Sequence, residues 1–250
     1  MNYVTYPFKT MRITQNYSGK TSHKPHTAGT PKDYPIDEGG ADSGKDFIFC
    51  PCDEMKIRRI YGVGTKGTNT LWLESTEKAT FADGTKDYFT LMITHPDDEN
   101  VKNLRVGDVF KRGEKITREG KDGATANHLH ISAGKGRMKG SGWMQNSKGK
   151  WVLTTTDKAS KPEDIFYIDP DFTKVISSGS LKFRQLPCKF TAGYYKIDTA
   201  VLNVRCGPGT QYRKKGVLCK GKTVKITATK DNWGRFSDDS WICLDYCVFM

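Results

Sequence analysis

The sequence predicts a mainly β fold, in which a larger antiparallel domain is followed by a small C-terminal β-barrel. Two observations carry this prediction. Short runs rich in β-branched and aromatic residues, separated by Gly, Asp-Gly or Asn, recur along the chain. In addition, no long stretch has the apolar periodicity of an amphipathic helix.

In the N-terminal part, three such runs are expected to be strands, at residues 55–61, 70–74 and 88–93. Asp83-Gly84, which lies between the last two runs, is typical of a tight hairpin turn. One short helix is expected from Asp98 to Leu104, capped by Asp97 or by Asp98. These elements predict an antiparallel β domain over residues 1–172.

The composition then changes. Small and polar residues over 173–187 indicate an interdomain linker, which we place at 173–190. Beyond it, short strand candidates separated by Gly-Pro-Gly, Lys-Gly-Lys and Asp-Asn turns follow closely, at residues 193–197, 201–205, 216–219, 224–228 and 233–236, the last continuing to 241–243. This spacing predicts a second domain, a small β-barrel over 191–250.

The chain is basic, with a net charge of +12 from 40 Lys and Arg against 28 Asp and Glu. Such a surface attracts polyanions. Nucleic acid is one candidate, and the anionic polymers of a bacterial envelope are another. A third interpretation is that the excess lysine only keeps the protein soluble.

The N-terminus lacks the pattern of a secretory signal, and no apolar run is long enough to span a bilayer. We therefore expect the protein to be made in the cytosol, without membrane insertion. Separately, we expect it to be a monomer. The chain has seven cysteines, an odd number that favours reduced thiols over a complete set of disulfides. Cys50-Pro51-Cys52 has too short a spacing for a structural zinc site.

The five histidines are the most informative residues. His128 and His130 are two positions apart, so in a strand both imidazoles lie on the same face. His95 follows the apolar run 89–93, and His23 and His26 precede Asp37. Imidazole is a frequent zinc ligand, and a catalytic zinc needs three protein ligands and one open position. The chain therefore has enough histidines for a metal and a general base.

Residues 113–130, which end in Asn127-His128-Leu129-His130, resemble the closing motif of the lysostaphin-type zinc endopeptidases, which cut peptides in bacterial peptidoglycan. The opening motif of that family, a His followed by an Asp, is matched by His23 or His26 with Asp37. Its central His after a core strand is matched by His95.

The resemblance implies a role for each of these residues. Asp37, His130 and one of His23 and His26 would hold Zn²⁺ and leave one position open for water. His95 and His128 would be the catalytic pair, one taking a proton from water and the other stabilising the oxyanion or protonating the leaving amine.

The first zinc ligand is left open between two histidines. The family usually has a short gap between this His and its Asp, whereas His26 lies eleven positions before Asp37 and His23 fourteen. The segment 28–31 is therefore interpreted as an insertion. Asp33 is a third-choice carboxylate and is expected to cap the loop.

In the C-terminal part, residues 201–210 together with Trp233 and Trp241 resemble a bacterial SH3 domain. This implies binding to cell-wall peptide or cross-bridge, with Trp233 and Trp241 either contacting the substrate or filling the barrel core. Tyr17 is the candidate for a tyrosine near the oxyanion, or else a packed aromatic residue. The whole arrangement is similar to a phage or prophage endolysin of a Gram-positive host, which acts on the wall after release from the cytoplasm.

The sequence leaves two alternative functions, a peptidoglycan-binding protein without peptidase activity and a nucleic-acid binder. A degenerate peptidase head could bind peptidoglycan, or regulate another hydrolase, without cutting. The presence of a full set of candidate ligands argues against this. A nucleic-acid binder is disfavoured because no zinc-finger, helix-turn-helix or RNA-binding sheet pattern is present.

Overall fold

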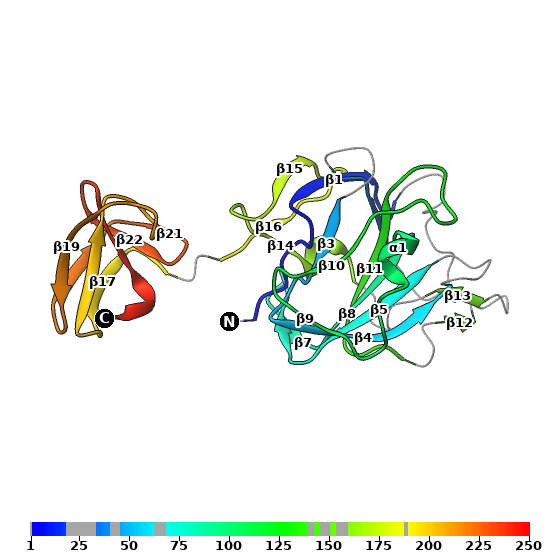
Figure 1. The fold of residues 1–250 in the computed structure, drawn as a ribbon, viewed down its shortest axis with the longest axis horizontal. Helices are drawn as coiled ribbons and strands as arrows, with labels where there is room; N and C mark the ends of the chain where they lie inside the picture. Colours follow the sequence, from blue (N-terminus) through cyan, green and yellow to red (C-terminus); the bar gives the residue numbers. More distant parts are fainter. Residues whose placement is uncertain are drawn as a thin grey trace. The chain divides into compact units, whose positions relative to one another are not determined.

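The computed structural model describes residues 2–18, 34–40, 46–62, 69–139, 160–187 and 190–250, together with the backbone of two short strands at 143–145 and 151–153. The chain divides into two compact units, Met1–Leu186 and Pro187–Met250. In both, nearly all helices and strands that the structure describes are β-strands (Figure 1). The predicted mainly β fold class is therefore confirmed.

The first unit is organised around one eight-stranded sheet (Figure 1). Every neighbouring pair in it is antiparallel except the first, which is parallel. In sheet order, its strands are β15 (Lys174–Ser177), β1 (Thr10–Gln15), β2 (Ile36–Glu38), β11 (Leu129–Lys135), β8 (Phe89–Thr94), β5 (Thr70–Ser75), β4 (Glu54–Tyr61) and β9 (Val109–Lys111).

Four two-stranded sheets and two short helices complete this unit. The strand pairs are β3 (Phe47–Phe49) with β10 (Lys115–Arg118), β6 (Ala79–Thr80) with β7 (Lys86–Asp87), β12 (Trp143–Gln145) with β13 (Trp151–Leu153), and β14 (Tyr167–Ile168) with β16 (Arg184–Gln185). The helices are α1 (Asp98–Val101) and α2 (Pro162–Ile165). The expected turn at Asp83-Gly84 lies between β6 and β7, with Gly84 at a φ of 87°.

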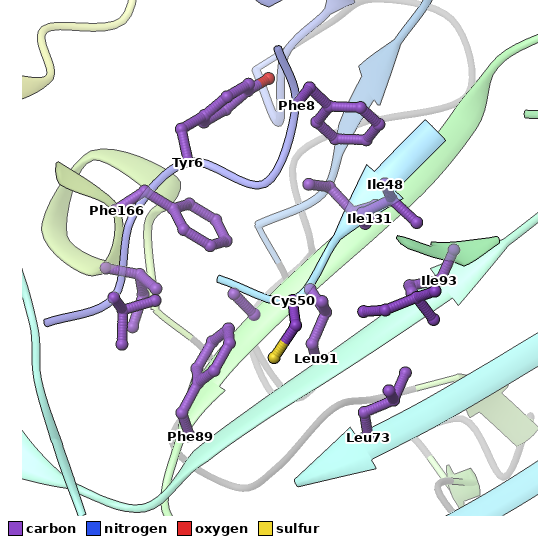
Figure 2. Close-up of a cluster of buried hydrophobic side chains, with 14 of the residues drawn as sticks. Tyr6, Phe8, Ile48, Cys50, Leu73, Phe89, Leu91, Ile93, Ile131 and Phe166 are labelled. Carbon is purple, nitrogen blue, oxygen red and sulfur yellow. The ribbon is translucent and has the colours of Figure 1, made fainter. Parts of the chain in front are cut away.

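One face of the large sheet carries the hydrophobic core. Leu71, Leu73, Leu91, Ile93 and Ile131 alternate along β5, β8 and β11, so their side chains lie on one face, and all five are buried. Figure 2 labels four of them, all but Leu71, in one cluster with Tyr6 and Phe8 of the N-terminal segment and with Phe166, which directly follows α2. The rigid core therefore supports the three central strands from one side.

The opposite face of the same strands is polar where β8 and β11 meet. His130 pairs with Thr94, and Thr94 pairs with Thr70 across the next strand. On the other side of β11, His130 pairs with Asp37 of β2. The strand register alone thus places two candidate site residues side by side.

Cys50 and Cys52 are buried in the apolar core (Figure 2 shows Cys50). Their thiols make short-range contacts to main-chain carbonyls, such as that from Cys50 Sγ to Phe110 O at 3.2 Å. All six cysteines that the structure describes are free. The described part of the chain also contains no helix with the length and hydropathy needed to cross a membrane.

Two boundaries differ from the sequence expectation. The predicted linker at 173–190 is largely part of the first unit, because β15 joins the large sheet and β16 pairs with β14. The ring of Phe183 also packs on Tyr6, with ring centroids 5.6 Å apart. The predicted helix 98–104 is shorter, since α1 ends at Val101 and a turn follows; Asp97 is its cap and accepts a hydrogen bond from Asn100 N.

The second unit consists of two sheets around one small core. The three-stranded sheet has the order β20 (Thr223–Ile226), β17 (Gly193–Ile197) and β24 (Cys247–Phe249). The five-stranded sheet has the order β19 (Lys214–Cys219), β18 (Val201–Arg205), β23 (Ser240–Cys243), β22 (Trp233–Ser237) and β21 (Ala228–Lys230), and a short 3₁₀ helix, η1, spans Leu244–Tyr246. Tyr195, Ile197, Ile226, Ile242 and Leu244 lie in the core.

Candidate functional site

Asp37 and His130 form the centre of the site. They are register partners on β2 and β11, and their neighbours Ile36 and Ile131 lie in the core, so the two polar side chains point to the opposite face. His130 Nδ1 lies 3.1 Å from Asp37 Oδ1. Both side chains remain partly accessible to solvent, with exposed fractions of 22% for His130 and 12% for Asp37.

The second oxygen of Asp37 has its own contact. Gln15 Nε2, at the end of the neighbouring strand β1, donates a hydrogen bond to Asp37 Oδ2 at 3.0 Å. Gln15 is therefore placed to fix the carboxylate plane and leave Oδ1 facing the histidines.

His128 and His95 complete the cluster. His128 Nε2 lies 3.7 Å from Asp37 Oδ1. The ring of His95 lies 4.8 Å from that of His128 and 6.2 Å from that of His130, centroid to centroid. Three of the five histidines and one aspartate, from segments up to 93 positions apart, thus meet at one end of the central strands.

The three histidines differ in what their Nδ1 atoms face. His95 Nδ1 lies 2.6 Å from the main-chain oxygen of Asp122, and His128 Nδ1 lies 2.9 Å from that of Ala126. A carbonyl oxygen can only accept, so in the neutral ring Nδ1 carries the hydrogen and Nε2 keeps its lone pair. In His130, by contrast, Nδ1 faces a carboxylate.

The environment of His95 favours the neutral imidazole. Burial is the main cause that lowers the pKa of His95, and the neighbouring His128 and His130 lower it further. The hydrogen bond to Asp122 O acts in the opposite direction without reversing the shift. At neutral pH, His95 is therefore able to accept a proton.

Glu38 anchors β2 through hydrogen bonds on the face opposite Asp37. It is buried on the core side, where it accepts hydrogen bonds from the Tyr6 hydroxyl and from Arg12 N at 2.6 Å. Burial raises the pKa of Glu38 to about 7, although its hydrogen bonds act to lower it. These bonds join β2 to β1 and to the N-terminal segment before it, and so fix the backbone that carries Asp37.

Two of the predicted zinc ligands, His23 and His26, and the loop residue Asp33 lie outside the described residues. Among the residues that are described, no three His, Cys, Asp or Glu side chains form a metal-binding group. Asp37 and His130 fit as two ligands of such a group. Ligand atoms about 2.0–2.1 Å from a tetrahedral zinc lie about 3.3 Å apart, close to the observed 3.1 Å between Nδ1 and Oδ1.

The described contacts of Tyr17 are with Glu163 and Tyr34. Its hydroxyl donates to Glu163 Oε1 at 2.8 Å, and its ring packs on Tyr34 with the centroids 5.2 Å apart. Burial and Glu163 raise the pKa of Tyr17 to about 12. The packed-aromatic alternative matches these contacts better than a role near the oxyanion.

The second unit has a cleft of about 840 Å³. Its lining includes Leu202, Arg205, Gln211, Trp233 and Tyr246. Trp233 is only 8% exposed, so it serves both the core and the cleft wall.

Trp241 does not line this cleft. It lies on β23 with the guanidinium of Arg235 6.0 Å from its ring centroid. The two tryptophans therefore occupy different environments within the same unit.

Sequence reasoning missed Gln15, Asn69 and Asp122, which contact the site residues or their loops. Gln15 and Asn69 lie outside the matched motifs, and Asp122 lies inside the closing motif at 113–130 but is not one of its histidines. Asn69 directly precedes a strand and Asp122 precedes a glycine, which in the sequence marks them only as turn residues.

No protein-family model matches the chain, and no curated protein sequence does. Among the solved structures similar to it are the following three. An NMR structure of lysostaphin is 16% identical and aligns over 97% of this chain and 88% of its own, with a TM-score of 0.35. The antimicrobial peptidase lysostaphin from Staphylococcus simulans is 16% identical over 96% and 92%, with a TM-score of 0.37.

The third is a zinc-containing peptidase from Vibrio cholerae. It is 17% identical and aligns over 63% of this chain and 41% of its own, with a TM-score of 0.30. Identities and TM-scores this low do not transfer an activity, so the function has to be argued from the residues of the site.

Proposed function

We propose that the protein is a zinc-dependent endopeptidase that cuts a peptide bond in bacterial peptidoglycan. The observation that carries the proposal is the difference among the three histidines. His95 and His128 each direct Nδ1 to a main-chain carbonyl, whereas His130 directs Nδ1 to the Asp37 carboxylate. This difference supports assigning proton transfer to His95 and His128 and metal binding to His130.

In this proposal, Asp37, His130 and either His23 or His26 would hold the metal. Gln15 supports Asp37 by occupying Oδ2, which leaves Oδ1 for the cation. When bound, zinc would lower the pKa of a water molecule and polarise the carbonyl of the peptide bond.

His95 and His128 supply the proton transfers. Both have Nε2 as the nitrogen with a lone pair, and their rings are adjacent. One accepts the proton of the attacking water, and the other, once protonated, stabilises the developing oxyanion or donates to the leaving amine. Peptidoglycan is proposed as the substrate because Asp37, His95 and the closing motif at 113–130 follow one another in the same order as in the lysostaphin-type endopeptidases.

The second unit is proposed to be an SH3-like module that holds the enzyme at the wall. Its cleft combines the aromatic ring of Tyr246 with the polar side chains of Arg205 and Gln211, a mixture suited to a peptide backbone. The unit also has 11 Lys and Arg residues against 5 Asp and no Glu, which favours association with anionic wall polymers.

The test of the peptidase is metal content measured together with hydrolysis of purified peptidoglycan. The full chain should hold close to one zinc and release new amino groups from the wall, and a chelator should abolish the release until zinc is added back. Asp37→Ala and His130→Ala should lose both metal and activity. Asp108→Ala, which removes an aspartate of a distant turn, is the matched control and should keep both.

The same assay separates His23→Ala from His26→Ala, since only one of the two should lose zinc. Stoichiometric zinc in both Asp37→Ala and His130→Ala would overturn the ligand assignment. Zinc binding without any new amino groups would favour the alternative, a wall-binding protein that does not cut.

The wall-binding role is tested with two exposed tyrosines of the second unit. Tyr246 lines the cleft and is 55% exposed, whereas Tyr194 is 54% exposed and lies outside the cleft. Tyr246→Ala should reduce co-sedimentation with purified walls in high salt, and Tyr194→Ala should not. Equal binding by both variants would contradict the role of the cleft. If the parent protein lost all binding when salt is added, the association with walls would be explained by attraction between charges alone.

A further inference from the structure

His95 is held in a backbone conformation that a histidine rarely adopts. It follows the last residue of β8 with a φ of 67°, in the left-handed region. For a residue other than glycine, this region costs free energy, so the surrounding contacts have to hold it there. Those contacts come from two segments, one at Asn69 and one at 118–122.

Asn69 holds the chain on both sides of His95. Its main-chain oxygen accepts a hydrogen bond from His95 N at 3.1 Å. Its side-chain Nδ2 donates to Asp98 Oδ1 and lies 3.5 Å from Pro96 O. Asn69 is 1% exposed, so its own end of each bond is shielded from water, whereas its acceptor Asp98 is exposed.

Asp122 connects this clamp to the imidazole ring. Its carboxylate Oδ2 accepts a hydrogen bond from Asn69 N at 2.6 Å, and its own main-chain oxygen lies 2.6 Å from His95 Nδ1. The side chain of Asp122 therefore fixes the position of the carbonyl that selects the tautomer of His95.

Gly120 allows this segment to approach closely. A Cβ at this position would lie 2.6 Å from Asp97 N and 2.8 Å from His95 O, both main-chain atoms. The oxygen of Gly120 also accepts a hydrogen bond from His128 N at 3.1 Å. The same short segment thus lies against both His95 and His128.

We propose that Asn69 and Asp122 are positioning residues that hold His95 with its hydrogen on Nδ1 and its Nε2 lone pair toward Asp37, His128 and His130. The expected effect on turnover rests on the proposed peptidase function, whereas the tautomer of His95 can be measured in the protein without substrate. Neither residue touches the reacting atoms. Their contribution is to keep His95 from sampling the opposite tautomer or rotating out of the site.

The experiment measures the tautomer and the turnover in the same variants. In the full chain with ¹⁵N-labelled histidine, at about pH 8.5, where an ordinary histidine is neutral, the NMR signals of His95 should report a protonated Nδ1 and an unprotonated Nε2. His95→Asn identifies these signals by their loss. Asp122→Ala should shift them toward a mixture of tautomers and lower kcat about tenfold, with KM nearly unchanged.

Asp122→Asn is the rescue variant, because its amide oxygen can still accept from Asn69 N, and it should restore both the tautomer and most of kcat. Asp108→Ala is the matched control, since Asp108 Oδ2 also accepts a main-chain hydrogen bond, from Arg105 N at 2.7 Å, in a distant turn. If Asp122→Ala does not fold, Asp98→Ala removes the exposed acceptor of Asn69 Nδ2 and should produce a smaller change in the same direction.

Parent-like His95 signals and kcat in a folded Asp122→Ala, or in Asp98→Ala where that variant has to replace it, would overturn the proposal. Failure of the parent protein to hydrolyse peptidoglycan would refute the peptidase function instead. The NMR comparison would still decide whether Asn69 and Asp122 position His95.

Discussion

The two units use opposite strategies for presenting side chains. In the first, the cluster of histidines with Asp37 lies on a sheet whose other face is packed into a core, and its contacts join residues 22, 27 and 93 positions apart. In the second, most strands pair with a neighbour in sequence, as β18 does with β19 and β22 with β23. All five histidines belong to the first unit, and none belongs to the second.

This difference matches the different requirements of the two proposed functions, catalysis by the first unit and wall binding by the second. Proton transfer needs side chains with fixed orientation and low exposure, which requires several segments to converge. Binding to a repetitive polymer needs exposed aromatic and basic side chains, which a small sheet can provide locally. Substitutions in the two units should therefore affect different measurements.

The largest expected effect is on turnover. His95→Ala and His128→Ala should each lower kcat by about a hundredfold or more, because each removes an imidazole that we propose to transfer a proton. Both variants should keep zinc and co-sediment with walls like the parent. Near-normal release of amino groups by His128→Ala would break the division of roles among the histidines.

A pair of truncations tests where the first unit ends. A chain ending at Leu186 should hydrolyse soluble wall peptides like the full protein but bind intact walls poorly, because the second unit is gone. A chain ending at Ser180 also loses Leu181 and Phe183, which pack on the core of the first unit. Its free energy of unfolding should fall by about 3 kcal/mol, measured by urea denaturation. Equal stability of the two truncated chains would instead support the linker predicted at 173–190.

Two glycines of the second unit test whether its stability can be changed without changing the activity of the first unit. A Cβ at Gly234 would lie 2.8 Å from Ile226 Cδ1 and from Leu244 Cδ2, whereas a Cβ at Gly216 would have no neighbour within 4 Å. Gly234→Ala should therefore destabilise the second unit by about 1–3 kcal/mol through overpacking, and Gly216→Ala should change its stability far less.

The readouts for both glycine variants are thermal unfolding of this unit, wall binding, and kcat on soluble peptides. The last should not change in either variant. A loss of kcat in Gly234→Ala would mean that the two units are not functionally separate.

The smallest expected effect concerns a thiol. Burial, together with the neighbouring Cys243, raises the pKa of Cys247 to about 11. Since only the thiolate reacts with iodoacetamide, its alkylation should be slow at pH 8 and should rise as the pH approaches 11. The exposed Cys219 serves as the internal reference in a mass-spectrometric time course, with Cys247→Ser to identify the site. Labelling of Cys247 as fast as Cys219 at pH 8 would contradict the expected burial.

Much of the fold follows from local pattern. The runs at 55–61, 70–74 and 88–93 correspond to β4, β5 and β8, and the runs beyond residue 190 correspond closely to the strands of the second unit. Alternation and turn residues predict such elements because they depend on a few neighbours in sequence. β15 and β16 were missed because their pairing partners lie far away in sequence, so their short polar runs resemble a linker.

For the site, the sequence alone determined which residue types are available and in what order, namely Asp37, His95 and the pair His128 and His130. Only the tertiary structure decided what each ring nitrogen faces. The choice between a carbonyl and a carboxylate partner depends on Asp122, Ala126 and Asp37, whose positions are set by strand register and by the close approach at Gly120. The carbonyl that His128 faces is local, two positions before it in the chain. For His95 and His130, a pattern of neighbours in sequence cannot encode the choice, because their partners lie 27 and 93 positions away and meet them only after the chain has folded.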